Sequence, residues 1–170
     1  MFEKHIFDSV SLEYFFEKYN IVPKELSLLD IGTGGGFPSV PLAIFYEDLN
    51  VTALDSISKK INAVEEFKHQ LQLKNLTLVN DRAENLKTKY DIVVSRAVSN
   101  LSKITKYAMP LVKDGGYFVC YKSKNVFDEI REAKELILKN KAEIVEVIEY
   151  QLPLDEKFER FLVVMKKRKK

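Results

Sequence analysis

A cluster of glycines near residue 35 constrains this chain more than any other feature. Four of the five residues from Gly32 to Gly36 are glycine; the apolar run Ser27–Ile31 precedes them and a helix-like segment, 37–46, follows. Glycine lets the backbone turn sharply and approach a ligand closely. A glycine-rich turn between a strand and a helix is typical of a nucleotide-binding loop. We therefore expect a strand, a ligand-binding turn and a helix, in this order.

The glycine cluster fits one of three nucleotide-loop patterns. A P-loop ends in Gly-Lys-Ser/Thr, which Phe37 and Pro38 do not provide. A dinucleotide fingerprint requires glycine at position 37 or 39, where the chain has Phe37 and Ser39. The acidic-x-Gly-x-Gly-x-Gly loop of S-adenosylmethionine (SAM) enzymes fits in full, at Asp30, Gly32, Gly34 and Gly36. SAM carries an ammonium group rather than a pyrophosphate, so an acidic residue suits it, and we interpret the cluster as a SAM loop.

Strand-like and helix-like segments alternate along the rest of the chain. Further strands are expected at residues 50–54, 76–79, 90–94, 116–121, 142–150 and 161–165, and helices at 12–19, 58–71, 101–111 and 126–137. Such alternation predicts an α/β, Rossmann-like fold, a mostly parallel sheet with helices on both faces. The connection 151–159 is too short for a parallel crossover, so the last two strands should form an antiparallel C-terminal edge.

Polar residues follow the second and third expected strands, where such sheets bind ligands. Asp55 comes directly after the second strand, and its carboxylate can accept both ribose hydroxyls of an adenosine. The alternative for Asp55 is a helix cap, although Ser58 is the expected cap of the next helix. In SAM folds the turn after the third strand, here 81–84, lies beside the adenine. At the N-terminus, Asp8 or Ser9 is the expected cap of the first helix.

Five stretches closely resemble, in this order, the ribosomal small-subunit methyltransferase G family, also called the glucose-inhibited division protein B family. They are KHIFDS, LLDIGTGGGFPSVPLAI, ALDSISKK, NDRAENL and VVSRAVSNL. The resemblance implies a class I SAM-dependent methyltransferase that transfers a methyl group to N7 of a guanine in 16S rRNA. It places Gly32 and Phe37 against the cofactor, and Ala83 and Glu84 beside the adenine. It also places Arg96, within Ser-Arg-Ala, at the active site, and Lys122 facing RNA.

The chemistry of guanine N7 agrees with this resemblance. N7 is an acceptor without a proton, so it can attack the methyl group directly and no general base is required. We assign no catalytic residue and expect catalysis by positioning. Arg96 is expected to bind the SAM carboxylate or an RNA phosphate, the alternative being an ion pair with a carboxylate such as Glu84. The target base should lie outside an RNA helix, stacked on Phe37 or Tyr121.

The remaining composition bears on partners and location. The net charge is +2, but the last five residues are basic, and without them 22 basic residues face 25 acidic ones. A basic tail suggests a polyanion partner, here 16S rRNA or the small ribosomal subunit. One cysteine and two histidines disfavour a disulfide framework and a zinc site. We expect a cytosolic monomer with no membrane partner and no metal.

Three units are expected along the chain. Residues 1–26 form an N-terminal helical segment shorter than is usual for the family, 27–166 the SAM-binding methyltransferase domain, and 167–170 the basic tail. Two other functions stay open on the residues alone. One is methyl transfer to a small molecule or a protein, and the other is a non-catalytic ribosome-binding module.

Overall fold

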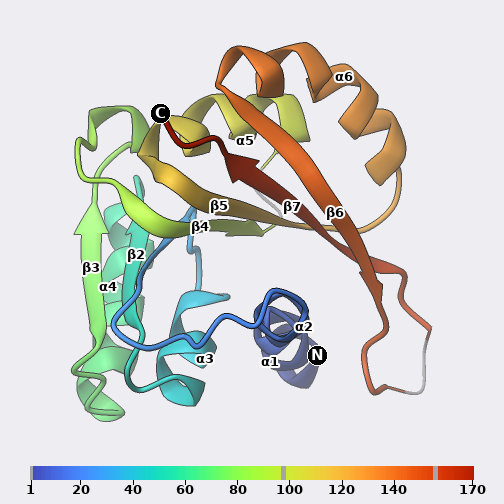
Figure 1. Cartoon of the computed structure of the whole chain (residues 1–170). Helices are drawn as coiled ribbons and strands as arrows, with labels where there is room; N and C mark the ends of the chain where they lie inside the picture. The colour runs from blue at the N-terminus through green and yellow to red at the C-terminus, as the bar shows by residue number, and fades with distance from the viewer. Residues whose placement is uncertain (1, 97–98, 155–156) are drawn as a thin grey trace.

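The computed structural model describes residues 2–96, 99–154 and 157–170 (Figure 1). The strands are β1 (Ser27–Ile31), β2 (Asn50–Asp55), β3 (Leu76–Asn80), β4 (Tyr90–Arg96), β5 (Val112–Lys122), β6 (Ala142–Tyr150) and β7 (Arg160–Lys167). The helices are α1 (Phe2–Val10), α2 (Glu13–Lys18), α3 (Ser39–Phe45), α4 (Ser58–Gln70), α5 (Leu101–Ala108) and α6 (Val126–Lys139). Two 3₁₀ turns, η1 (Ala83–Asn85) and η2 (Met109–Leu111), follow β3 and α5.

The seven strands form one sheet in the order β3-β2-β1-β4-β5-β7-β6. Strands β1 to β5 run parallel, and β7 pairs antiparallel with both β5 and β6. This is the predicted α/β Rossmann-like architecture with antiparallel C-terminal strands. Strands β2 and β3 lie on one side of β1, and β4 and β5 lie on its other side. The connections that follow β1 and β4 therefore lead in opposite directions along the sheet. Such a switch point opens a crevice at the carboxyl ends of the strands.

Apolar side chains cover both faces of the sheet. On one face α2, α3 and α4 supply residues such as Phe15, Leu42 and Val64. On the other, α5 and α6 supply residues such as Ile104 and Ile137. Figure 1 shows α5 and α6 on the side of the sheet opposite α1, α2 and α3. Because Phe15 is fully buried in the first cluster, the N-terminal segment shares the core of the sheet.

The predicted helix caps are wrong at both places. Helix α1 runs through Asp8 and Ser9, and the Ser9 hydroxyl donates to the carbonyl of His5 at 2.6 Å, as in a helix interior. Ser58 is already the first residue of α4 and makes no capping bond. The carboxylate of Asp55 instead accepts the N–H of Ile57 at 3.0 Å. The expected helix 12–19 corresponds to α2, and α1, which packs against α3, is a separate helix that the apolar spacing did not indicate.

Strand β5 begins at Val112, four residues before the expected strand 116–121, and includes Asp114, Gly115 and Gly116. Pairing of β5 with β4 shifts between Tyr90 and Ile92, because β5 carries extra residues there. Gly115 has a φ of +80°, in the left-handed region that favours glycine. The glycines therefore form a bulge that bends the strand without ending it.

Candidate cofactor and substrate site

A cavity of about 500 Å³ opens at the carboxyl ends of β1, β2 and β3. Four predicted cofactor positions line it, namely Gly32, Asp55, Ala83 and Glu84. Ile104 and Tyr107 of α5 also line it. The structure thus brings the glycine loop, the acid after β2 and the turn after β3 together around one space, as the order of these motifs predicts.

The glycine loop requires its glycines. Gly32, Gly34 and Gly36 have φ angles of +73°, +58° and +93°, where residues with a Cβ are strained. A Cβ on Gly36 would also lie 2.7 Å from Cγ2 of Val40. The N–H of Gly32 donates to the carbonyl of Leu54 at 2.8 Å, which ties the loop to the end of β2. The loop is therefore fixed to the end of β2, and its first glycine, Gly32, lines the cavity.

Asp55 holds the glycine loop and faces the cavity at once. Its Oδ2 accepts the N–H of Gly34 at 2.9 Å, and its Oδ1 accepts the N–H of Ile57. A carboxylate offers about four acceptor sites, so two remain for other donors. The side chain of Asn80 donates to the carbonyl of Asp55 at 2.9 Å and steadies its backbone. Both interpretations of Asp55, as a residue that caps the start of α4 and as an acceptor for the ribose hydroxyls, are compatible with this geometry.

Asp30 lies fully buried at the end of β1, outside the lining of the cavity. Its Oδ2 accepts the N–H of Ser39 at 3.2 Å, but its Oδ1 has no hydrogen-bond partner among the described residues. Burial raises the pKa of this carboxyl to about 6. A buried polar atom without a partner needs a donor. Because Asp30 is fully buried and lines neither cavity, its contact with the ammonium group of a cofactor stays a prediction.

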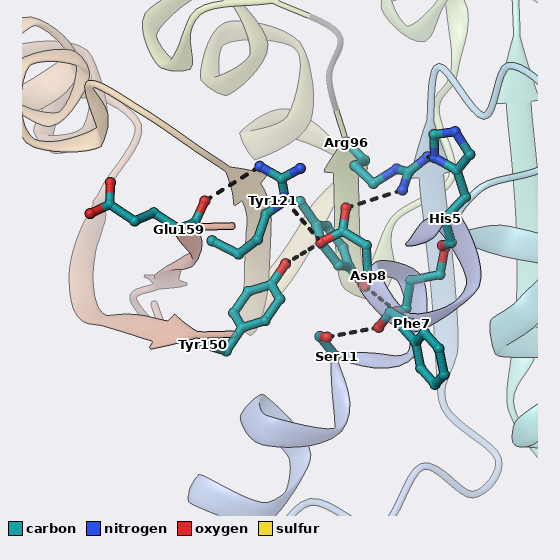
Figure 2. A network of polar contacts seen from close by, with 10 residues as sticks. His5, Phe7, Asp8, Ser11, Arg96, Tyr121, Tyr150 and Glu159 are labelled. Atoms are coloured by element: carbon teal, nitrogen blue, oxygen red, sulfur yellow. Dashed lines mark hydrogen bonds and ion pairs between the residues drawn. The ribbon is translucent and has the colours of Figure 1, made fainter. Parts of the chain in front are cut away.

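A second cavity, of about 300 Å³, lies at the carboxyl ends of β4 and β5. It contains Arg96 and Lys122, two of the five predicted site residues that do not line the first cavity. The other three, Asp30, Gly34 and Phe37, line neither cavity. Nη1 of Arg96 donates to Oδ2 of Asp8 at 3.1 Å, and its Nη2 lies 2.9 Å from Nδ1 of His5 (Figure 2). The alternative expected for Arg96, an ion pair with a carboxylate, is thus present, but its partner is Asp8 of α1 and not Glu84.

Lys122 has internal partners. Its Nζ donates to the carbonyl of Ser99 at 2.7 Å and forms an ion pair with Glu129 at 2.7 Å. The Glu129 carboxylate also accepts the N–H of Leu101, the first residue of α5. Lys122 therefore joins β5 to α5 and α6, and its contact with RNA stays a prediction.

Phe37 and Tyr121 were the two residues expected to stack on the target base, and the prediction for Tyr121 is wrong. Its side chain is buried, and its hydroxyl donates to the carbonyl of Ser9 at 2.7 Å. Phe37 is half-buried where the glycine loop meets α1. Its ring centroid lies 5.4 Å from that of His5 and 5.6 Å from the guanidinium carbon of Arg96. Phe37 thus lies between the glycine loop and the second cavity.

Sequence reasoning missed three residues of the second cavity and its wall, namely Asp8, Tyr150 and Arg160. They come from α1 and from the two C-terminal strands, and no local pattern joins them. Asp8 lies in the stretch KHIFDS, and this stretch was the one available signal. Ala97, part of the Ser-Arg-Ala motif, falls outside the described residues.

Two further findings concern the described residues only. They contain no group of three or more His, Cys, Asp or Glu side chains that could hold a metal ion. No helix among residues 2–96, 99–154 and 157–170 has the length and hydropathy needed to span a membrane.

Comparison with known proteins decides the family. A family model described as rRNA small subunit methyltransferase G matches residues 1–158. A protein of Lachnoclostridium phytofermentans named ribosomal RNA small subunit methyltransferase G is 41% identical, over 97% of this chain and 69% of the relative. A protein of the same name from Staphylococcus saprophyticus is 38% identical over the same shares. The chain belongs to this family.

Solved structures that resemble this member of the methyltransferase G family support its fold. TYW2 of M. jannaschii, solved in complex with AdoMet, superposes with a TM-score of 0.70 at 16% identity, over 91% of this chain and 75% of that chain. A SAM-dependent O-methyltransferase from Thermotoga maritima gives a TM-score of 0.68 at 16% identity, over 96% and 65%. The family resemblance and the methyltransferase fold expected from the sequence are both confirmed.

Proposed function

We propose that the protein transfers a methyl group from SAM to N7 of a guanine in 16S rRNA. Membership of the methyltransferase G family supports this activity. The observation that carries it in the structure is the pairing of two adjoining spaces. A cavity walled by the glycine loop and Asp55 lies beside a basic cavity that contains Arg96. The first suits an adenosine cofactor, and the second suits a polyanion.

The residues of the first cavity fit SAM. Asp55 retains acceptor capacity for the ribose hydroxyls, and the glycine loop allows close approach of the ligand. Ala83 and Glu84 of η1 stand where the adenine is expected. When bound, SAM supplies a methyl group on a positively charged sulfur.

The second cavity supplies positioning rather than proton transfer. His5 is its one histidine, and a guanidinium can only donate, so Nδ1 of His5 must accept from Arg96. Burial and the charge of Arg96 lower the pKa of His5, which favours the neutral ring. Attack by N7 needs no base, and these neutral and cationic groups agree with that chemistry. The basic lining favours RNA over an uncharged small molecule.

The test is methyl transfer with methyl-labelled SAM and small-subunit RNA from cells that lack this protein. We expect label at guanine N7, from the naked RNA or from the assembled subunit. Asp55→Ala should lose SAM binding, whereas Asp48→Ala, an exposed aspartate before β2, should behave as the parent. Label elsewhere on the RNA would contradict the N7 assignment, and transfer without RNA would indicate a small-molecule or protein substrate. SAM binding without transfer to any of these would indicate a non-catalytic module. We further propose that the protein acts as a cytoplasmic monomer.

A further inference from the structure

Asp8 stands where three distant parts of the chain meet. It lies in the last turn of α1 and its side chain is 9% exposed. Its Oδ2 accepts from Nη1 of Arg96 at the end of β4. Its Oδ1 accepts from the hydroxyl of Tyr150 at 2.6 Å and lies 3.6 Å from Nε of Arg160, the first residue of β7. Figure 2 shows the side chains of Arg96 and Tyr150 converging on Asp8 from different elements. One carboxylate therefore contacts two guanidinium groups.

The Arg96 guanidinium is held by two groups of the same helix. Asp8 binds Nη1 and His5, one turn earlier on α1, accepts from Nη2. Two bonds to different nitrogens fix both the position and the plane of a guanidinium. The face of Phe37 lies 5.6 Å from its central carbon, on the side of the glycine loop. Arg96 is thus oriented before any ligand arrives.

The Arg160 guanidinium is held less completely. Its Nε is buried and has no hydrogen-bond partner among the described residues, although Oδ1 of Asp8 lies 3.6 Å away. Its Nη1 makes one bond of 3.3 Å, to the carbonyl of Glu159. A guanidinium has five N–H donors, so Arg160 keeps donors for a ligand in the second cavity, which it lines.

Tyr150 fixes the carboxylate that holds both arginines. Burial and the negative charge of Asp8 raise the pKa of Tyr150, so its hydroxyl stays protonated and donates. With Tyr150 bound to Oδ1 and Arg96 to Oδ2, rotation of the carboxylate would break both bonds. The Asp8 cluster, defined here as Asp8, Arg96, Tyr150 and Arg160, is a preorganised unit.

The charges of the cavity leave a positive excess. Two carboxylates line it, and one of them, Glu129, pairs with Lys122. The other, Asp8, is a single negative charge between the two positive charges of Arg96 and Arg160. Lys4 and Lys124 add to the positive side. A group with a negative charge and several acceptor oxygens, such as a phosphate, matches this excess.

We propose that Asp8 is a positioning residue, whose carboxylate holds Arg96 and Arg160 side by side so that their free donors bind one RNA phosphate next to the target guanine. This inference rests on the proposed function and deepens it. Asp8 itself does not touch the RNA. Fixing the phosphate fixes the nucleotide attached to it, and small errors in the placement of reacting atoms reduce the rate strongly.

The first experiment observes the guanidinium groups directly by ¹⁵N NMR of the arginine side chains, assigned with Arg96→Lys and Arg160→Lys. In the parent protein, we expect restrained signals for both arginines that shift saturably with inorganic phosphate. In Asp8→Asn one amide oxygen replaces two carboxylate oxygens, so at least one arginine should become mobile and respond weakly. Asp91→Asn is the matched control, because Asp91 bonds Ser27 and Lys113 at the other end of β4. Unchanged arginine signals in Asp8→Asn would overturn the proposal.

The second experiment separates turnover from binding. In Asp8→Asn we expect kcat to fall about tenfold or more. The KM for RNA should stay within about threefold, because the variant also loses one negative charge from the cavity. SAM affinity should not change. A variant with the parent's kcat, or one that lost RNA affinity and kept kcat, would refute the positioning role.

Tyr150→Phe keeps the proposal testable if Asp8→Asn folds poorly. It removes one hydrogen bond from Asp8 and leaves every charge in place, so a smaller fall in kcat with an unchanged melting temperature supports the same role. Full activity in this variant would count against it. If the parent transfers no methyl group to RNA, the proposed function fails. The NMR arm would still decide whether Asp8 holds the arginines.

Discussion

At the scale of single residues, burial of the Asp30 carboxyl makes the stability of the fold depend on pH. Its pKa is raised from 3.8 to about 6 because the carboxyl is fully buried. Between these values the folded state holds a proton that the unfolded state has lost, so stability falls as the pH rises through this window. The shift corresponds to about 3 kcal/mol by pH 7. A mutated side chain that cannot ionise should remove this dependence.

We therefore predict that Asp30→Asn unfolds with a flatter pH profile than the parent between about pH 4 and pH 7. Urea unfolding at several pH values measures the free energy of unfolding of both proteins. Asp48→Asn, at an exposed site, should keep the parent's profile. Identical slopes for Asp30→Asn and the parent would show that Asp30 does not titrate in this window.

At the scale of elements, one ion pair joins β5, α5 and α6. Glu129 of α6 binds Nζ of Lys122 and the N–H of Leu101, where α5 begins. Glu129→Gln leaves a largely buried ammonium without its counter-charge, which we expect to cost about 2 kcal/mol. Lys122→Met leaves a carboxylate that still accepts at a helix N-terminus, and should cost about half as much. Thermal unfolding measures the stability of both variants. A larger loss of stability in Lys122→Met than in Glu129→Gln would contradict the prediction.

At the scale of the whole molecule, charge is unevenly distributed. The chain has a net charge of +2, yet the second cavity gathers Lys4, Arg96, Lys124 and Arg160 around one carboxylate, that of Asp8. The other carboxylate of the cavity, Glu129, pairs with Lys122. Two or three phosphate contacts there predict a KM for RNA that rises about tenfold from 50 to 200 mM salt. SAM affinity should hardly change.

Lys4→Met should reduce the slope of this salt dependence by about one contact. Lys24→Met, at an exposed position before β1, should not. Steady-state kinetics at saturating SAM measures both. A salt dependence that both variants share with the parent would place the RNA contacts elsewhere.

The order of strands and helices could be predicted because it rests on local physics. Apolar spacing distinguishes strands from helices, and the backbone at Gly32, Gly34 and Gly36 needs φ angles that only glycine adopts freely. The place of Asp55 at the cavity could be predicted as well, because residues at the carboxyl ends of neighbouring parallel strands lie close together. These features depend on a few consecutive residues, and so does the family resemblance that they carry.

Helix caps and side-chain partners could not be predicted, because they depend on packing. Asp8 was expected to start a helix and instead lies inside α1, where it meets Arg96, Tyr150 and Arg160. Those contacts exist because β7 inserts between β5 and β6 and brings the ends of the C-terminal strands to α1. The sequence by itself determined the glycine loop and the kind of sheet that carries it. Only the tertiary structure decided which charges share a cavity, since that depends on contacts between residues more than 80 positions apart.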